Sequence, residues 1–232
     1  MSKLQNETYL IKILDLMRDD IENSQRGEFF HKFYDLKEQS YTTVSPEVIR
    51  LYKNILRTSV KKFKADKSMN NILSATISLS HNLIPTNLYD IEIDEIFNIC
   101  LNLDDSRTKA NVLTALGEYN PESPLFKDYF DSQSNRVAAD ALAVEAKKTL
   151  SDEILDRIDL FLASTNPYFV ASGIYLIARL TEYFSEKNNT EEQKKLARFF
   201  PIISKFSTHP HEMIRKRALK SMPAVEILRK SA

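Results

Sequence analysis

The residues that could carry chemistry are few and scattered along the sequence. The four histidines, His31, His81, His209 and His211, include no pair spaced four residues apart, the spacing that places two zinc ligands on one face of a helix. The single cysteine, Cys100, stands in an apolar run, where a small buried thiol is expected. We therefore expect no metal site and no cofactor.

Adjacent acidic residues that could act as catalytic carboxylates have a simpler explanation. Asp152 with Glu153, and Glu191 with Glu192, stand in the predicted first turns of helices, where negative charge stabilises the helix dipole. The sequence also contains no glycine-rich phosphate loop and no nucleophile elbow. These observations predict that the chain is not an enzyme.

The composition restricts the environment and the partners. Of 232 residues, 32 are Lys or Arg and 32 are Asp or Glu, so no overall electric field draws the chain to DNA or to an anionic membrane. One cysteine fits a reducing compartment, and the N-terminal residues lack the basic and apolar regions of a signal peptide. No apolar run approaches the ~18 residues of a membrane span. We expect a cytoplasmic protein without membrane insertion.

Glycine is unusually rare, which indicates the fold class. The chain has three glycines, whereas average usage of about 7% would give roughly sixteen. Sheets and tight turns use glycine freely for positive φ angles, so the composition favours helices joined by short polar turns. Apolar residues at helical spacing predict helices over 4–23, 29–36, 47–64, 69–83 and 91–103.

From residue 104 the sequence repeats itself. Four segments align, namely 105–118, 134–147, 166–179 and the segment from 211 onward. One column of the alignment holds mostly small residues, Val112, Ala141, Gly173 and Ala218. The next column is aliphatic in every copy, with Leu113, Leu142, Ile174 and Leu219, and three positions later stand Leu116, Glu145, Ile177 and Met222. These offsets place the columns on one helical stripe that should be buried.

Each repeated helix should follow another helix, predicted over 91–103, 123–131, 152–163 and 191–206. Gly117 stands where a glycine would end the helix 105–118. One helix pair per ~30–45 residues predicts an all-α fold, an α-solenoid of antiparallel helix pairs.

The repeated segments resemble a known family. Residues 105–118 resemble the second helix of a bacterial HEAT repeat, 135–142 and 214–222 resemble it more weakly, and 199–203 resemble a proline-containing first helix. We expect an N-terminal helical cap over 1–45 and a HEAT-like solenoid over 46–232, clearest over 90–222. The resemblance implies a non-catalytic scaffold or adaptor whose groove, lined by second helices, binds another protein.

Two enzyme classes with a HEAT fold are alternatives. His211 and Glu212 resemble the His-Glu motif of HEAT-fold iron hydroxylases, which need several such motifs, whereas this sequence has one. HEAT-like DNA glycosylases have a similar length, but the resemblance implies a strongly basic aromatic face, and this chain has no tryptophan and no net charge. A nucleic-acid-binding or glycosylase-like protein remains the alternative to a scaffold.

Basic residues recur beside the predicted core stripe and are candidates for contact with an extended or helical acidic segment of a partner. The groove candidates are Arg107, Lys109, Arg136, Tyr168, Arg215 and Arg217. Arg107 with Asn111, and Arg136 with Asp140, are also spaced to form a polar ladder between neighbouring repeats, a structural role that uses the same residue types.

A second basic strip lies on the predicted helix 47–64. It consists of Arg50, Lys53, Arg57, Lys61 and Lys64. The surrounding residues 50–67 carry a net charge of +6, whereas residues 86–106 carry −6. The strip is either a solvated helix face or a competing docking surface for an acidic partner.

Overall fold

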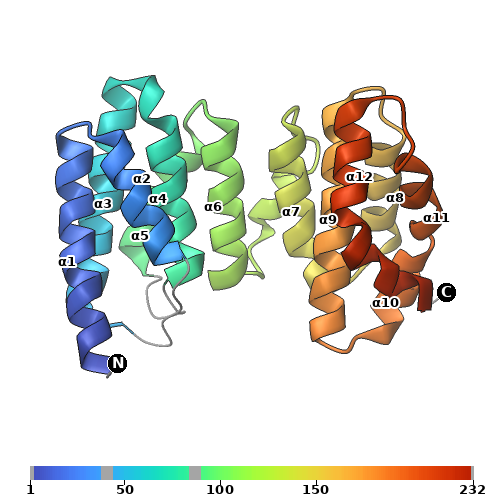
Figure 1. The fold of residues 1–232 in the computed structure, drawn as a ribbon, viewed down its shortest axis with the longest axis horizontal. Coiled ribbons are helices and arrows are strands. Elements are labelled where there is room, and N and C mark those ends of the chain that lie inside the picture. Colours follow the sequence, from blue (N-terminus) through green and yellow to red (C-terminus); the bar gives the residue numbers. More distant parts are fainter. Residues whose placement is uncertain (1–2, 38–43, 84–89, 231–232) are drawn as a thin grey trace. The chain divides into compact units, whose positions relative to one another are not determined.

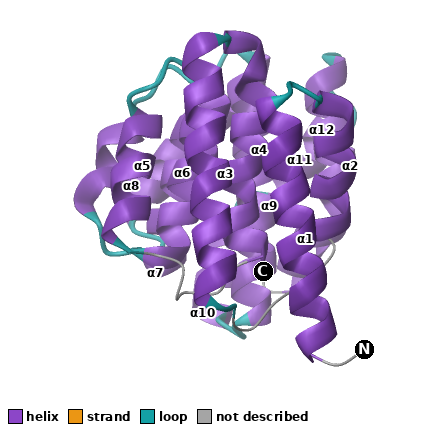
Figure 2. Ribbon diagram, turned by 90° about the vertical axis from the view of Figure 1, so that its left-hand side faces the viewer, coloured by secondary structure: helices purple, strands orange, loops and turns teal. Residues whose placement is uncertain are grey.

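The computed structural model describes residues 3–37, 44–83 and 90–230, and every regular element in these ranges is a helix (Figures 1 and 2). The all-α prediction is therefore confirmed. The chain forms two compact units, unit 1 over residues 1–121 and unit 2 over residues 122–232. The division predicted after residue 45 stays a prediction.

The described residues of unit 1 form three successive helix pairs. Its helices are α1 (Lys3–Glu22), α2 (Arg26–Lys37), α3 (Pro46–Ala65), α4 (Asn70–Leu83), α5 (Ile91–Leu101) and α6 (Ser106–Tyr119), with a short 3-10 helix, η1 (Lys67–Met69), before α4. The first helices α1, α3 and α5 pack side by side in one layer, and the second helices α2, α4 and α6 form the other. This two-layer stack of helix pairs is the arrangement of an α-solenoid.

Unit 2 repeats the two-layer arrangement with less regular first helices. Its elements are η3 (Pro124–Tyr129), α7 (Asn135–Lys148), α8 (Asp152–Leu162), α9 (Pro167–Glu186), α10 (Thr190–Ala197), α11 (Phe200–Phe206), α12 (Glu212–Val225) and η4 (Glu226–Lys230). Helices α7, α9 and α12 form one continuous layer, with α9 in the middle. The 3-10 helix η3 packs on α7. Helices α8 and α10 pack on α9, and α11 packs on α12.

Side chains that cap the helices fix where the second helices begin. Asp105 Oδ2 accepts a hydrogen bond from the Thr108 amide at 2.7 Å, and Asn166 Oδ1 accepts one from the Tyr168 amide at 3.0 Å. Each such cap satisfies an otherwise unpaired amide and stabilises a helix by about 1 kcal/mol. The caps therefore place the start of α6 and of α9 relative to their neighbours.

The repeated columns form the core, with one exception. The small column is buried throughout, and the aliphatic column is buried at Leu113, Leu142 and Ile174. Leu219 is 55% exposed, so its predicted burial is wrong. It lies on α12, the last helix of its layer among the described residues, and no following helix covers it there. Glu145, which interrupts the third column, forms an ion pair with Lys148 at 2.7 Å.

Two predicted helix boundaries are also wrong. The predicted helix 191–206 is two helices, α10 and α11, and Pro201 stands in the first turn of the second. Gly117 does not end α6, which continues to Tyr119. No glycine of the described residues has a positive φ angle, so Gly117 does not adopt the conformation of a helix-ending glycine. Among the described residues, none of the helices combines the length and the apolar composition that crossing a membrane requires.

Candidate functional site

Polar side chains join the second helices of unit 2. Asn135 of α7 donates to the Tyr168 carbonyl at 3.2 Å and to Ser172 Oγ at 2.6 Å, both on α9. Further along, Arg179 Nη1 of α9 donates to Asp140 Oδ1 of α7 at 2.7 Å. The predicted ladder between neighbouring repeats therefore exists at this seam, and Asp140 is one of its members.

Asp140 lies between two arginines in a buried environment. Its side chain is 10% exposed, and Arg136 Nε lies 3.8 Å from Oδ2, whereas Arg179 contacts Oδ1. Burial raises the pKa of the Asp140 carboxyl above its ordinary value, although the charges of Arg179 and Arg136 oppose this shift. The two arginines are thereby fixed in orientation along the α7–α9 seam.

One turn before Arg179 on α9, an exposed tyrosine contacts Arg217 of α12. Tyr175 is 44% exposed, and the guanidinium groups of Arg179 and Arg217 lie 5.5 Å and 5.0 Å from its ring centre. Tyr168, seven residues earlier, lies on the same face of α9 and is 57% exposed. Cation–π contacts hold the arginines beside the ring while leaving their remaining donors available.

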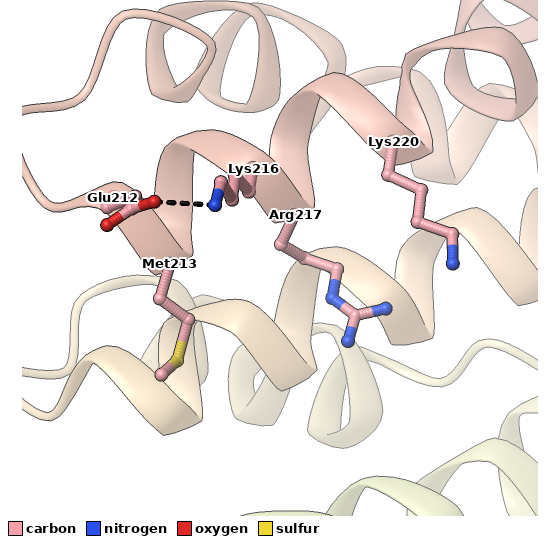
Figure 3. Close-up of a pocket in the computed structure, with 5 residues that line it drawn as sticks. All are labelled: Glu212, Met213, Lys216, Arg217 and Lys220. Carbon is pink, nitrogen blue, oxygen red and sulfur yellow. Dashed lines mark ion pairs between the residues drawn. The ribbon is translucent and has the colours of Figure 1, made fainter.

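A hollow of about 450 Å³ lies along α12 (Figure 3), and Arg217, which contacts Tyr175, is one of the residues that line it. Met213, Arg217 and Lys220 extend from one side of α12 and line it, while Lys216 pairs with Glu212 at 2.5 Å. The apolar part of the hollow is thus bordered by cationic groups.

We call this area the α9–α12 surface. It consists of Tyr168, Tyr175, Arg179, Met213, Lys216, Arg217 and Lys220. Glu182, one turn beyond Arg179 on α9, is exposed and ends the basic part of the surface. Exposed aromatic rings among arginines are the residue types that dominate binding energy at protein interfaces.

Of the six predicted groove residues, four lie in unit 2 and two lie in unit 1. Arg136, Tyr168 and Arg217 belong to or border the layer of α7, α9 and α12 in unit 2. Arg215 bends back instead, and its Nη1 donates to the carbonyls of His209 and Pro210 at 2.9 Å and 3.3 Å. Its contacts stabilise the loop before α12.

Arg107 and Lys109 belong to α6 of unit 1, where the polar ladder recurs. Arg107 donates to Asn71 Oδ1, and Asn111 Nδ2 donates to Ser74 Oγ at 2.8 Å, so α6 is joined to α4. Lys109 is half-buried on the same helix.

Five residues of the α9–α12 surface were not predicted from the sequence: Tyr175, Arg179, Met213, Lys216 and Lys220. The first two follow Tyr168 at helical offsets of seven and eleven, a signal that was present in the sequence.

The basic strip on α3 is partly neutralised inside unit 1. Lys53 pairs with Asp90 and, at 2.9 Å, with Glu92, and Arg57 pairs with Glu92 as well. Burial alone would raise the pKa of Asp90. Hydrogen bonds from Lys53 and from the Ile93 amide outweigh burial, so the pKa of Asp90 is lowered. Charges of the acidic segment 86–106 and of the basic segment 50–67 therefore pair with each other where α3 lies beside the start of α5.

Comparisons with known proteins give no family and no relative: no family model matches the chain, and no curated protein matches it. Solved structures with some likeness include an engineered protein at 17% identity, covering 96% of this chain and 97% of that one, with a TM-score of 0.44. A designed armadillo repeat protein in complex with the peptide (KR)4 is 16% identical, covering 91% and 99%, with a TM-score of 0.40. TM-scores below 0.5 do not establish a shared fold, so the solenoid arrangement rests on the contacts within each unit.

Among the described residues, no group of three or more His, Cys, Asp or Glu side chains could hold a metal ion. Asp140 and Glu212, two acidic residues beside the α9–α12 surface, are each paired with a cation of that surface. What the α9–α12 surface offers chemically is recognition by charge, aromatic contact and hydrogen bonding.

Proposed function

We propose that this chain is a non-catalytic scaffold or adaptor of the HEAT type, which binds an extended acidic segment of another protein on the α9–α12 surface. The observation that carries the proposal is Tyr175, an exposed ring held between Arg179 and Arg217 on adjacent helices. A cytoplasmic location belongs to the same proposal and is supported by Cys100, the only cysteine, which is buried as a free thiol.

The dimensions of the layer suit an extended ligand. Neighbouring helices pack about 8–10 Å apart, so a ligand that crosses α7, α9 and α12 spans roughly 20 Å. An extended chain covers this distance with about six or seven residues. Carboxylates along such a segment would meet Arg136, Arg179 and Arg217 in turn, and an apolar residue would contact Met213 or Tyr175.

Charge placement favours an acidic protein segment over nucleic acid. The cations of the surface are interrupted by Asp140 and Glu212 and end at Glu182. A duplex requires a longer uninterrupted row of phosphate contacts, which gives binding a steep salt dependence.

Fluorescence anisotropy with a labelled octapeptide that alternates glutamate and threonine tests the proposal. Threonine favours the extended form, and a peptide that alternates lysine and threonine is the matched probe of opposite charge. We expect the acidic peptide alone to bind and Arg217→Glu to weaken it at least tenfold. Lys205→Glu, an exposed charge reversal on α11 of the same unit, should leave the affinity unchanged.

Thermal melting of each variant shows whether the fold is kept, because exposed charges contribute little to stability. Equal binding of both peptides, or an unchanged affinity in Arg217→Glu, would overturn the proposal. Binding of duplex DNA that falls steeply with salt and is lost in Arg217→Glu would favour the nucleic-acid alternative instead.

A further inference from the structure

A separate concave surface lies between α3 and α5 of unit 1. We call it the α3–α5 groove, a hollow of about 320 Å³ lined by Arg57, Val60, Lys61, Lys64, Ile96 and Ile99. All six residues belong to unit 1, so the groove has no residue in common with the α9–α12 surface of unit 2.

The groove has an apolar floor. Val60 and Ile96 are buried beneath it, while Ile99 is 42% exposed and projects from α5. Its volume stands at the lower end of the range of small-ligand pockets, about 300–1,000 Å³. The floor therefore suits one or two aliphatic side chains of a partner.

The edge formed by α3 is cationic. Arg57, Lys61 and Lys64 follow one another at helical spacing over about 10 Å, or two turns. Arg57 is paired with Glu92, but Lys61 and Lys64 are exposed, and no carboxylate of the described residues forms an ion pair with either of them. The part of α3 after Arg57 therefore carries positive charge that no ion pair within the described residues neutralises.

The edge formed by α5 is different. Its lining residues are Ile96 and Ile99, the exposed residues next to them in sequence are Glu95 and Asn98, and the helix carries no lysine or arginine. A ligand in the groove would therefore meet cations on one side and neutral or acidic groups on the other. This asymmetry selects a ligand with two unlike flanks and an apolar stripe between them.

We propose that the α3–α5 groove binds a short acidic amphipathic helix of a partner protein. Leucine-like residues three and four positions apart would fill the floor, as in other complexes of a helix in a groove. Carboxylates on one flank of the helix would pair with Lys61 and Lys64, and uncharged polar residues on the other would face Glu95 and Asn98. The groove is a second binding site, independent of the extended segment proposed for unit 2.

The test uses the full chain and a labelled 15-residue helical peptide with leucines at three- and four-residue spacing, glutamates on one flank and glutamines on the other. A peptide of the same composition in scrambled order is the control for charge alone. We expect the periodic peptide to bind more tightly than the scrambled one. The double variant Lys61→Glu with Lys64→Glu, and separately Ile99→Ser, should each weaken it at least tenfold.

Matched controls separate this site from the rest of the molecule. Lys12→Glu with Lys127→Glu reverses two exposed lysines elsewhere and should bind the helical peptide as the wild type does. Arg217→Glu should also leave it unaffected, so failure of the unit 2 proposal and failure of this one are distinguishable. Equal affinity for the two peptides, or no loss in the Lys61 and Lys64 variant, would overturn the inference.

An anionic membrane is the other ligand class that a cationic groove could meet. If vesicles of phosphatidylserine and phosphatidylcholine bind with the same dependence on Lys61 and Lys64 while the helical peptide does not bind, the groove is a lipid site and the inference is wrong. No sedimentation with such vesicles, together with binding of the periodic peptide, would support it.

Discussion

At the scale of single residues, α9 packs closely against α8 at Gly173. A Cβ atom at this position would lie 2.9 Å from Phe161 Cβ and 3.2 Å from Leu162 Cδ2. Phe161 Cβ is fixed to the backbone and cannot swing aside, so the two helices would have to separate. We predict that Gly173→Ala lowers the free energy of unfolding by about 1–3 kcal/mol, measured by urea denaturation.

Gly27 provides the matched control for this substitution. It is exposed in the first turn of α2, and no atom lies within 4 Å of the position that a Cβ would occupy. Because alanine is a better helix former than glycine, Gly27→Ala should stabilise the protein by up to about 1 kcal/mol. A neutral or stabilising effect of Gly173→Ala would show that the α8–α9 contact is looser than described.

The thiol of Cys100 should be unreactive in the folded protein. Burial raises the pKa of Cys100 to about 12, although the positive charge of Lys64 opposes the shift. Since the thiolate is the reactive form, a disulfide reagent should label the native chain very slowly up to pH 9 and quickly in urea. Rapid labelling of the native chain at pH 8 would contradict the packing around α5.

Residue burial could be predicted where the repeat itself supplies the neighbours. The small column predicted that Ala141 and Gly173 are buried, because each faces a helix that the sequence also predicted. Leu219 and Arg215 could not be placed in this way. Leu219 is exposed because no helix of the described residues follows α12 in its layer, and the position of Arg215 depends on the path of the loop through His209 and Pro210.

At the scale of helices, the α7–α9 seam depends on a buried carboxylate, and its titration has a definite sign. Burial raises the pKa of Asp140, so the folded state holds the proton more tightly than the unfolded state. The stabilising contribution of Asp140 should therefore grow as the pH falls through its raised pKa, and level off below the ordinary value of about 3.9. This is the opposite of the usual behaviour of paired carboxylates, whose pKa is lowered and whose stabilising contribution is lost on acidification.

Comparison with Asp140→Asn isolates this contribution, because asparagine cannot ionise. The difference in unfolding free energy, wild type minus variant, should shift in favour of the wild type between pH 7 and pH 3.5. Urea denaturation at a series of pH values measures it. A shift in the opposite direction would mean that Arg179 and Arg136 outweigh burial.

Helix boundaries show which local signals suffice. Most predicted helices agree with the observed ones within a few residues, because period and caps act locally. The break between α10 and α11 was missed although its cause is local: the Pro201 ring clashes with the carbonyl four residues earlier, at Ala197, where α10 ends. The prediction that α6 ends at Gly117 was wrong for a long-range reason. The Tyr119 hydroxyl donates to the Ser80 carbonyl at 2.7 Å and stabilises the last turn of α6.

At the scale of the whole molecule, the sequence predicted the repeating architecture better than the binding surface. Helix pairs follow from periodicity alone, and both units show them. The α9–α12 surface depends on which side chains of neighbouring helices meet, such as Arg217 with Tyr175, and a single sequence with degenerate repeats does not give that register. The α3 strip shows the same limit, because two of its five cations, Lys53 and Arg57, are paired with Asp90 and Glu92 of a distant segment.

Amide chemical-shift mapping tests most directly whether the layer of α7, α9 and α12 receives an extended acidic segment. The isotope-labelled full chain would be titrated with the glutamate–threonine octapeptide. We predict that the largest shifts occur at Tyr168, Tyr175, Arg179 and residues Met213–Lys220 of α12, and that Arg217→Glu abolishes them. Shifts concentrated on the outer helices α8, α10 and α11, or none on unit 2 at saturating peptide, would contradict it.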